Sequence, residues 1–324
     1  MNCRRIPIVV AVFALATDPV IAQDADTDHS PVVLTGTQAT YSVTSALVLD
    51  TPIEVVNVPE DGREFAVLRA YLERRKDRFA MLFSAATAVV ALTNALPGDP
   101  LYRYAREANV GIVNIDAAIP WTFDTPGVAL IDMPDSDVQW ATPSTEASEG
   151  IAPWFWLSIP NTLRMADIVA NDLAALYPAF EATISANLDR FKRTLLETRA
   201  AYQNRLLEAA DDTVFALTGD FVYMTNDLGL FVDGYFIRQD VDWTNDDLTA
   251  LTAYLRAHEI GVVIHKWVPS DAIQAAVQAA GAQLVVLDTG DQGRIVGDTL
   301  APDGLQQILV DNLEKITSAL SQRE

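Results

Sequence analysis

The sequence predicts an α/β protein in which two similar α/β halves lie on either side of a long helix. Segments with the pattern of short buried strands alternate with segments of helical periodicity along the chain, which is typical of α/β architecture. Apolar residues make up 50% of the 324 residues, enough for a sizeable core. This composition excludes a largely disordered chain.

The first residues, 1–22, have the pattern of a cleavable secretory signal. Arg4 and Arg5 precede an apolar stretch over residues 6–16, which is too short to span a bilayer. Val20-Ile21-Ala22 fits a small-residue cleavage site. A buried N-terminal strand or helix is the alternative. Residues 23–31 are polar and are predicted to form a flexible leader.

The only cysteine, Cys3, precedes the apolar stretch, so neither a lipid anchor nor a disulfide is expected in the mature chain. The formal net charge of −22 argues against nucleic acid and anionic membranes as partners. No other apolar run approaches transmembrane length. We therefore expect a soluble protein of the periplasm, with no membrane insertion after signal cleavage.

The first half, residues 32–177, is predicted to open with a strand at 32–35, a helix at 38–47 and a strand at 53–58. Apolar residues at helical spacing predict a helix over 64–75. Further strands are predicted at 79–83, 110–115 and 128–131. The stretch 134–150 is rich in Ser, Thr, Asp and Glu and is predicted to be a surface loop.

A helix is predicted to begin near Asn161, and Pro178 suits the first turn of a second helix that continues to about Leu207. This second helix would be about 45 Å long. Both a coiled-coil arm and a strut between domains fit its length.

The second half, residues 209–324, again shows strands that alternate with helices. Strands are predicted at 214–217, 231–236, 261–265 and 283–287. Helices are predicted at 246–258, 270–280 and 303–320, the first with Thr244 or Asn245 as its N-cap.

Four motifs occur in a fixed order. They are Pro153-Trp154-Phe155-Trp156-Leu157-Ser158 before Asn161; Leu217-Thr218-Gly219-Asp220-Phe221-Val222-Tyr223 before Leu228-Gly229-Leu230; Asp246-Asp247-Leu248 before Gly261-Val262-Val263-Ile264; and Ala280-Gly281-Ala282-Gln283 before Val285-Val286-Leu287-Asp288. In this order and spacing the chain resembles the zinc/manganese solute-binding proteins of ABC transporters, the TroA-like and ZnuA-like group. The resemblance covers nearly the whole mature chain, most clearly from 150 to 290.

The resemblance implies a TroA-like fold, with α/β lobes at 32–177 and 209–324 joined by a rigid linking helix at 178–208. It implies a ligand held between the lobes, and an ABC permease of the inner membrane as partner. The cargo implied is zinc, manganese or another transition metal ion, or a metal complex.

Most of the family's metal-ligand positions are replaced in this sequence. The first histidine of the family would fall near Phe65, Trp154 stands at the second position and Thr218 at the third. Asp288 alone matches a ligand position. One monodentate carboxylate does not make a tight transition-metal site.

Two kinds of replacement site remain open. His265 ends a predicted strand at the edge where Asp288 follows the next, so both are candidate metal ligands, with Asp220, Asp291 or Glu64 adding oxygens. An ordinary strand-end residue is the alternative for His265.

The second kind of site is aromatic. Six aromatic residues are expected in or near segments that border the ligand: Trp121, Trp154, Phe155, Trp156, Tyr223 and Trp267. Such a surface could stack against an organic ring, a cation or a metal chelate, or its residues could simply pack in the core, as is expected for Trp156.

The leading hypothesis is a periplasmic solute-binding protein whose cargo is a transition metal bound at a non-standard site, or a metal complex. The alternative is an accessory or interaction protein that kept the fold and binds no ligand. An enzyme is not expected, because the sequence has no Gly-x-Ser-x-Gly, P-loop or His-Glu-x-x-His motif.

Overall fold

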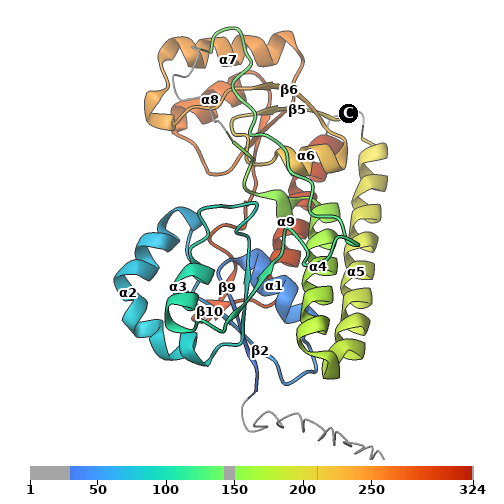
Figure 1. Cartoon of the computed structure of the whole chain (residues 1–324). Helices are drawn as coiled ribbons and strands as arrows, with labels where there is room; N and C mark the ends of the chain where they lie inside the picture. Colours follow the sequence, from blue (N-terminus) through green and yellow to red (C-terminus); the bar gives the residue numbers. More distant parts are fainter. Residues whose placement is uncertain (1–29, 142–149, 210, 323–324) are drawn as a thin grey trace, which may run out of the picture. The chain divides into compact units, whose positions relative to one another are not determined.

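Two four-stranded parallel sheets organise the protein (Figure 1). The first has the order β2-β1-β3-β4 and consists of β1 (Val32–Thr35), β2 (Glu54–Asn57), β3 (Ala88–Ala91) and β4 (Val113–Asp116). The second has the order β6-β5-β7-β8 and consists of β5 (Thr213–Ala216), β6 (Phe231–Tyr235), β7 (Val262–His265) and β8 (Gln283–Val286). The two sheets share one topology, which confirms the predicted pair of α/β halves.

This computed structural model describes residues 30–141, 150–209 and 211–322. The predicted signal at 1–22 lies outside these residues, as does most of the predicted leader. Pro31–Glu324 forms one unit. No helix in the described part of the chain combines the length and apolar character needed to cross a membrane.

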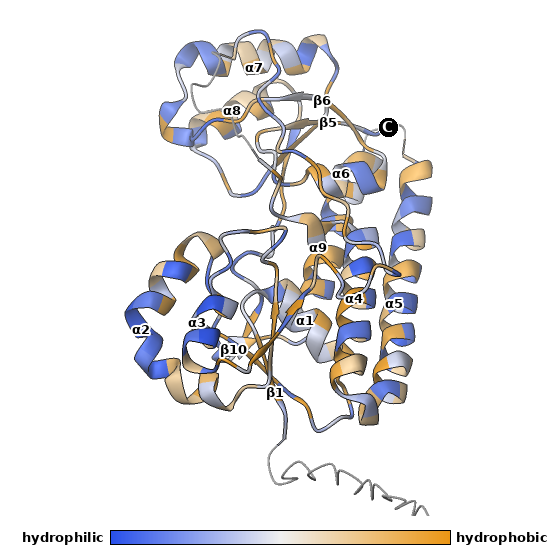
Figure 2. Cartoon of the chain, viewed as in Figure 1, coloured by the Kyte–Doolittle hydropathy of each residue, from blue (hydrophilic) through white to orange (hydrophobic). Residues whose placement is uncertain are grey.

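The helices of the first half are α1 (Gln38–Leu47), α2 (Phe65–Ala85) and α3 (Leu101–Ala108). Thr37 caps α1, because its side chain accepts a hydrogen bond from the backbone N–H of Thr40. The bounds of α1 agree with the prediction, whereas α3 was not predicted. Figure 2 shows the exposed middle of α2 as largely hydrophilic.

The strand predicted at 79–83 is wrong, because these residues continue α2. Phe79 and Phe83 are four residues apart and both buried, with ring centroids 5.9 Å apart, so they share one helix face. The predicted end of the helix at Arg75 coincides with a kink, where φ is −128° and ψ is 16°. The strand lies further along the chain, at β3.

The strand predicted at 128–131 is also wrong. The backbone N–H of Ile131 donates to the Tyr223 hydroxyl at 2.9 Å rather than to a strand. The only pairing described nearby is an isolated bridge between Asp132 and Ile151. A side chain of α6 therefore satisfies the backbone that a sheet would otherwise pair.

Between the sheets in sequence lie η1 (Phe155–Leu157), α4 (Ile159–Leu176), η2 (Pro178–Phe180) and α5 (Glu181–Leu207). Ser158 caps α4 by accepting a hydrogen bond from the N–H of Asn161, and a proline lies in the first turn. The long predicted helix is confirmed as α5, with 27 residues. It packs along α4 and also against α1 and α9 (Figure 1).

The second half contains α6 (Val222–Leu228), η3 (Asp240–Asp242), α7 (Asn245–Ala257), α8 (Asp271–Ala279) and α9 (Gly304–Ser321). Thr244 caps α7 in a capping box with Asp247, as one of the two predicted caps. The hairpin β9 (Ile295–Val296) and β10 (Thr299–Leu300) was not predicted.

The C-terminal segment returns to the first half of the chain. Gln38 donates through Nε2 to the carbonyl of Ala301 at 2.9 Å, and the N–H of Leu305 donates to Ser42 Oγ at 3.1 Å. Helix α9 therefore packs on α1 as well as on β8. The lobe boundaries at 177 and 208 stay a prediction.

Candidate functional site

The ends of β5 and β7 place an aspartate beside a lysine. Asp220 follows β5, and its Oδ2 accepts a hydrogen bond from Thr218 Oγ1 at 2.7 Å. Lys266 follows β7 directly, and its Nζ lies 2.6 Å from the same Asp220 oxygen. Because β5 and β7 are parallel neighbours, their carboxyl ends meet at one edge of the sheet. The Asp220 side chain is only 7% exposed, so the carboxylate of this ion pair is buried, whereas the Lys266 side chain is 32% exposed.

A second aspartate joins this pair from the loop after β8. Asp291 accepts a hydrogen bond from the backbone N–H of Phe65 at 2.8 Å, at the first residue of α2. The pKa of Asp291 is raised to about 6, mainly by burial and also by the negative charges of Glu64 and Asp220. The hydrogen bond from the Phe65 N–H and the positive charge of Lys266 lower the pKa of Asp291. Glu64, Asp220, Lys266 and Asp291 thus interact electrostatically, and we call them the carboxylate–lysine cluster.

Two positions assigned to metal ligands by the resemblance contact this cluster. Phe65 donates its backbone N–H to Asp291, and Thr218 donates its hydroxyl to Asp220. Sequence reasoning named Asp220, Asp291 and Glu64 only as additional oxygen donors, and it missed Lys266. The available signal was the place of Lys266 immediately after a predicted strand, next to His265.

His265, at the end of β7, is buried among polar and aromatic neighbours. It is 2% exposed, its Nε2 lies 3.9 Å from Asp240 Oδ1, and its ring lies edge-on to Trp267 at 4.7 Å. Burial lowers the pKa of His265 to about 4, so the imidazole is neutral at pH 7. In the described part of the chain its buried Nδ1 has no hydrogen-bond partner.

Asp288 has a different set of contacts. Its N–H donates to Asn312 Oδ1 at 2.8 Å, its Oδ1 accepts from the N–H of Gly290 at 2.8 Å, and its Oδ2 lies 3.6 Å from Arg294 Nε. Within the described residues, no group of three or more His, Cys, Asp or Glu side chains is arranged to hold a metal ion. The metal-binding roles of Asp288 and His265 stay predictions.

One tryptophan of η1 contacts the loop that carries Asp291, and the tryptophan at the N-cap of η1 packs against that first tryptophan. Trp156 is fully buried and donates through Nε1 to the carbonyl of Thr289 at 3.0 Å. Trp154 is half-buried and lies edge-on to Trp156, with ring centroids 5.4 Å apart. Trp154 thus reaches the Asp291 loop through Trp156.

The other predicted aromatic residues differ in their surroundings. The Tyr223 side chain is buried, and its hydroxyl donates to the carbonyl of Ala152 at 3.0 Å while accepting from Ile131, which gives it a structural role. The Trp121 indole N–H bonds to the carbonyl of Asn114 in the first half. Trp267 lies beside the cluster, because Lys266 Nζ is 4.9 Å from its ring centroid.

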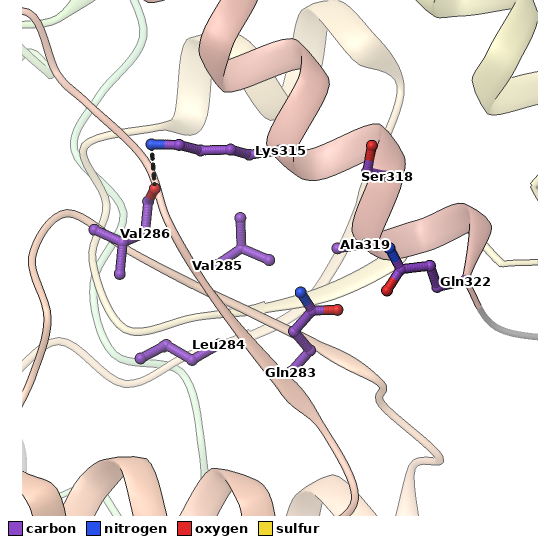
Figure 3. A pocket seen from close by; sticks show the side chains of 8 residues that line it. All are labelled: Gln283, Leu284, Val285, Val286, Lys315, Ser318, Ala319 and Gln322. Atoms are coloured by element: carbon purple, nitrogen blue, oxygen red, sulfur yellow. Dashed lines mark hydrogen bonds between the residues drawn. The ribbon is translucent and has the colours of Figure 1, made fainter.

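A separate pocket of about 440 Å³ lies between β8 and the end of α9 (Figure 3). Lys315 spans one side of it and donates to the carbonyl of Val286 at 3.0 Å. The residues that line this pocket include no carboxylate and no imidazole, so its chemistry does not favour a metal cation. They are Gln283, Leu284, Val285, Val286, Lys315, Ser318, Ala319 and Gln322.

Paired parallel α/β sheets, a long helix and charged side chains at the carboxyl ends of the strands are compatible with a protein that binds a ligand at that edge. The sequence matches the ZnuA family, described as zinc-uptake complex component A, periplasmic, over residues 84–319. The chain therefore belongs to this family of periplasmic binding components rather than to an enzyme family, which confirms the resemblance. A comparison of this chain with curated protein sequences found no match.

Solved structures share this fold at low sequence identity. A mutant of FpvC from Pseudomonas aeruginosa is 20% identical, with a TM-score of 0.68 over 89% of this chain and 98% of that one. The Zn(II)-bound ZnuA-like domain of AdcA from Streptococcus pneumoniae is 17% identical, with a TM-score of 0.65 over 90% of this chain and 100% of that domain. A periplasmic metal binding protein from Candidatus Liberibacter asiaticus is 17% identical, with a TM-score of 0.65 over 90% of this chain and 99% of that chain. These likenesses confirm the predicted fold.

Proposed function

We propose that this chain is the solute-binding component of an ABC importer, and that it receives a transition metal ion or a metal complex at the carboxylate–lysine cluster. The permease of the inner membrane is its expected partner. Family membership supports the transport role, and the solved relatives that share the fold include FpvC with Ni²⁺ or Mn²⁺ bound.

One observation carries the choice of site. Phe65 and Thr218 come from different halves of the chain, and each donates a hydrogen bond to an aspartate of the same cluster. The cluster holds three carboxylates and one ammonium group, so it favours a positively charged cargo. Carboxylate oxygens and a neutral imidazole, such as that of the nearby His265, suit divalent transition metals.

Calorimetric titration of the mature chain with Zn²⁺, Mn²⁺ and Ni²⁺, and with their citrate complexes, tests this proposal. We expect saturable binding of one cargo per chain. The double variant Asp220→Asn, Asp291→Asn should lose it, because both carboxylates become neutral amides. Asp298→Asn is the matched control, since Asp298 is exposed in the turn between β9 and β10. The absence of saturable binding by every ion and complex would contradict the proposal.

A second candidate function, an accessory protein without cargo, rests on a separate observation. Among the described residues, no three His, Cys, Asp or Glu side chains lie close enough to hold a metal ion between them, and this includes the three carboxylates of the cluster. An accessory protein would show no cargo binding in the same titration. Its interaction with a partner protein would persist in the Asp220→Asn, Asp291→Asn variant.

A further inference from the structure

The Lys266 ammonium group lies among carboxylates at the candidate cargo site. It is 2.6 Å from Asp220 Oδ2, and its charge also acts on Asp291. Thr218 donates to the same Asp220 oxygen. The protein thus places a cation of its own against the carboxylates that a cargo cation would need.

A second lysine–aspartate pair in the described structure shows why this one is distinctive. Lys192 forms an equally close pair with Asp167 at 2.7 Å, but it joins α5 to α4, away from the carboxyl ends of the strands. The side chains of Lys192 and Lys266 are similarly exposed, at 35% and 32%. Only Lys266 combines an ion pair with a position in the carboxylate–lysine cluster.

The ammonium group of Lys266 has a second favourable position close at hand. Its Nζ already lies 4.9 Å from the Trp267 ring centroid, within the range of a cation–π interaction. The indole N–H of Trp267 donates to Asp240 Oδ1 at 3.1 Å, so the ring is held in place. A flexible four-carbon stem lets the ammonium leave Asp220 and stay against this ring without a change in the backbone.

We propose that Lys266 is a tethered competitor of the cargo cation: it neutralises Asp220 in the empty protein and is displaced onto Trp267 when a divalent transition metal binds. The inference rests on the proposed function and assigns the residue that sets affinity at that site. Metal binding includes the cost of breaking the lysine–aspartate pair, so Lys266 lowers affinity and favours release of the cargo.

The test compares Zn²⁺ and Mn²⁺ affinities of the wild-type chain, Lys266→Met and Lys192→Met by calorimetry. Lys266→Met keeps an apolar stem that can pack on Trp267 and removes the charge. We expect its dissociation constant for at least one metal to fall by about tenfold or more, because a like charge near the metal is removed. Lys192→Met should bind like the wild type. Circular dichroism checks folding, and Lys266→Gln replaces the methionine variant if that variant does not fold.

The outcomes separate this inference from the proposed function. Metal binding by Lys266→Met but not by the wild type also supports the inference, because it shows strong competition. If the wild type binds metal as tightly as Lys266→Met, or more tightly, the inference is overturned and the proposed function stays intact. No binding by any variant overturns both. Equal tightening in Lys192→Met shows a general effect of charge and overturns the specific role of Lys266.

Discussion

The backbone N–H of Phe65 donates a 2.8 Å hydrogen bond to the carboxylate of Asp291, across a sequence separation of 226 residues. This bond joins the start of α2 to the loop after β8. The positive end of a helix dipole favours a carboxylate there. The candidate site is therefore built from both halves of the chain, and neither half contains it alone.

Cation binding should weaken as the pH falls from 7.5 to 5. Burial raises the pKa of Asp291 to about 6, so this carboxylate is ionised above pH 6 and becomes protonated below it. His265, with a pKa lowered to about 4, stays neutral over this window. Affinities of the wild type and Asp291→Asn, measured at half-unit pH steps, check this. The variant should show a flatter profile, and identical profiles would exclude a role for Asp291.

Gly219 lies between Thr218 and Asp220, and an added side chain there should disturb the site. A Cβ would meet Met133 Sδ at 2.6 Å and Pro134 Cγ at 2.8 Å, which are too close for either to stay in place. We expect Gly219→Ala to reduce metal affinity by about tenfold and to lower the free energy of unfolding by about 1–3 kcal/mol.

Gly111→Ala is the control for that substitution, because its Cβ would meet only Asn109 Oδ1 at 3.4 Å. Thermal melts and metal titrations of both variants provide the measurement. If the two variants have the same thermal stability and the same metal affinity, the close packing around Gly219 is not required for either property.

Trp156 and Trp154 should respond differently to replacement by phenylalanine. Trp156→Phe loses the hydrogen bond to the Thr289 carbonyl and should lower the free energy of unfolding by about 1–3 kcal/mol. In the described structure Trp154 Nε1 is buried without a hydrogen-bond partner, so Trp154→Phe removes an unpaired donor. This substitution should lower the free energy of unfolding by less than Trp156→Phe does. Urea unfolding of both variants measures the difference. A larger loss in Trp154→Phe would contradict these contacts.

Asp172 should destabilise the fold at neutral pH. Burial raises its pKa to about 6, above the ordinary value of about 4, so the folded state disfavours the charged form. The cost decreases as the pH falls from the folded pKa towards the ordinary value of about 4, is small there, and is fully present above the folded pKa. Asp172→Asn should therefore raise the free energy of unfolding at pH 8 by ~1–2 kcal/mol, with little change at pH 4.

Urea unfolding at both pH values checks this expectation, with exposed Asp189→Asn as control. A gain of equal size at pH 4 and pH 8 would show that the effect does not come from the Asp172 charge.

Local sequence patterns predicted most elements but not those governed by longer-range packing. The Thr244 cap and the regular apolar pattern of α5 are local, so the sequence reveals them. The run from Phe79 to Phe83 is too short to separate strand from helix, and the kink at Arg75 hides the continuation of α2. The pairing of Ile131 with the Tyr223 hydroxyl also has no local signal.

The same distinction applies to the site. The family resemblance directed attention to Phe65 and Thr218, and the structure places both against the carboxylate–lysine cluster. It did not reveal Lys266, because a lysine after a strand is ordinary in sequence. Only the parallel pairing of β5 with β7 brings Lys266 to Asp220.

A crystal structure of the protein with Zn²⁺ or Mn²⁺, read by the anomalous scattering of the metal, tests the location of the site most directly. We expect one strong peak about 2.0–2.6 Å from carboxylate oxygens of Asp220 or Asp291. We also expect Lys266 Nζ to have moved away from Asp220. A fully occupied metal elsewhere in the chain, with the Lys266–Asp220 pair intact, would contradict the proposed site.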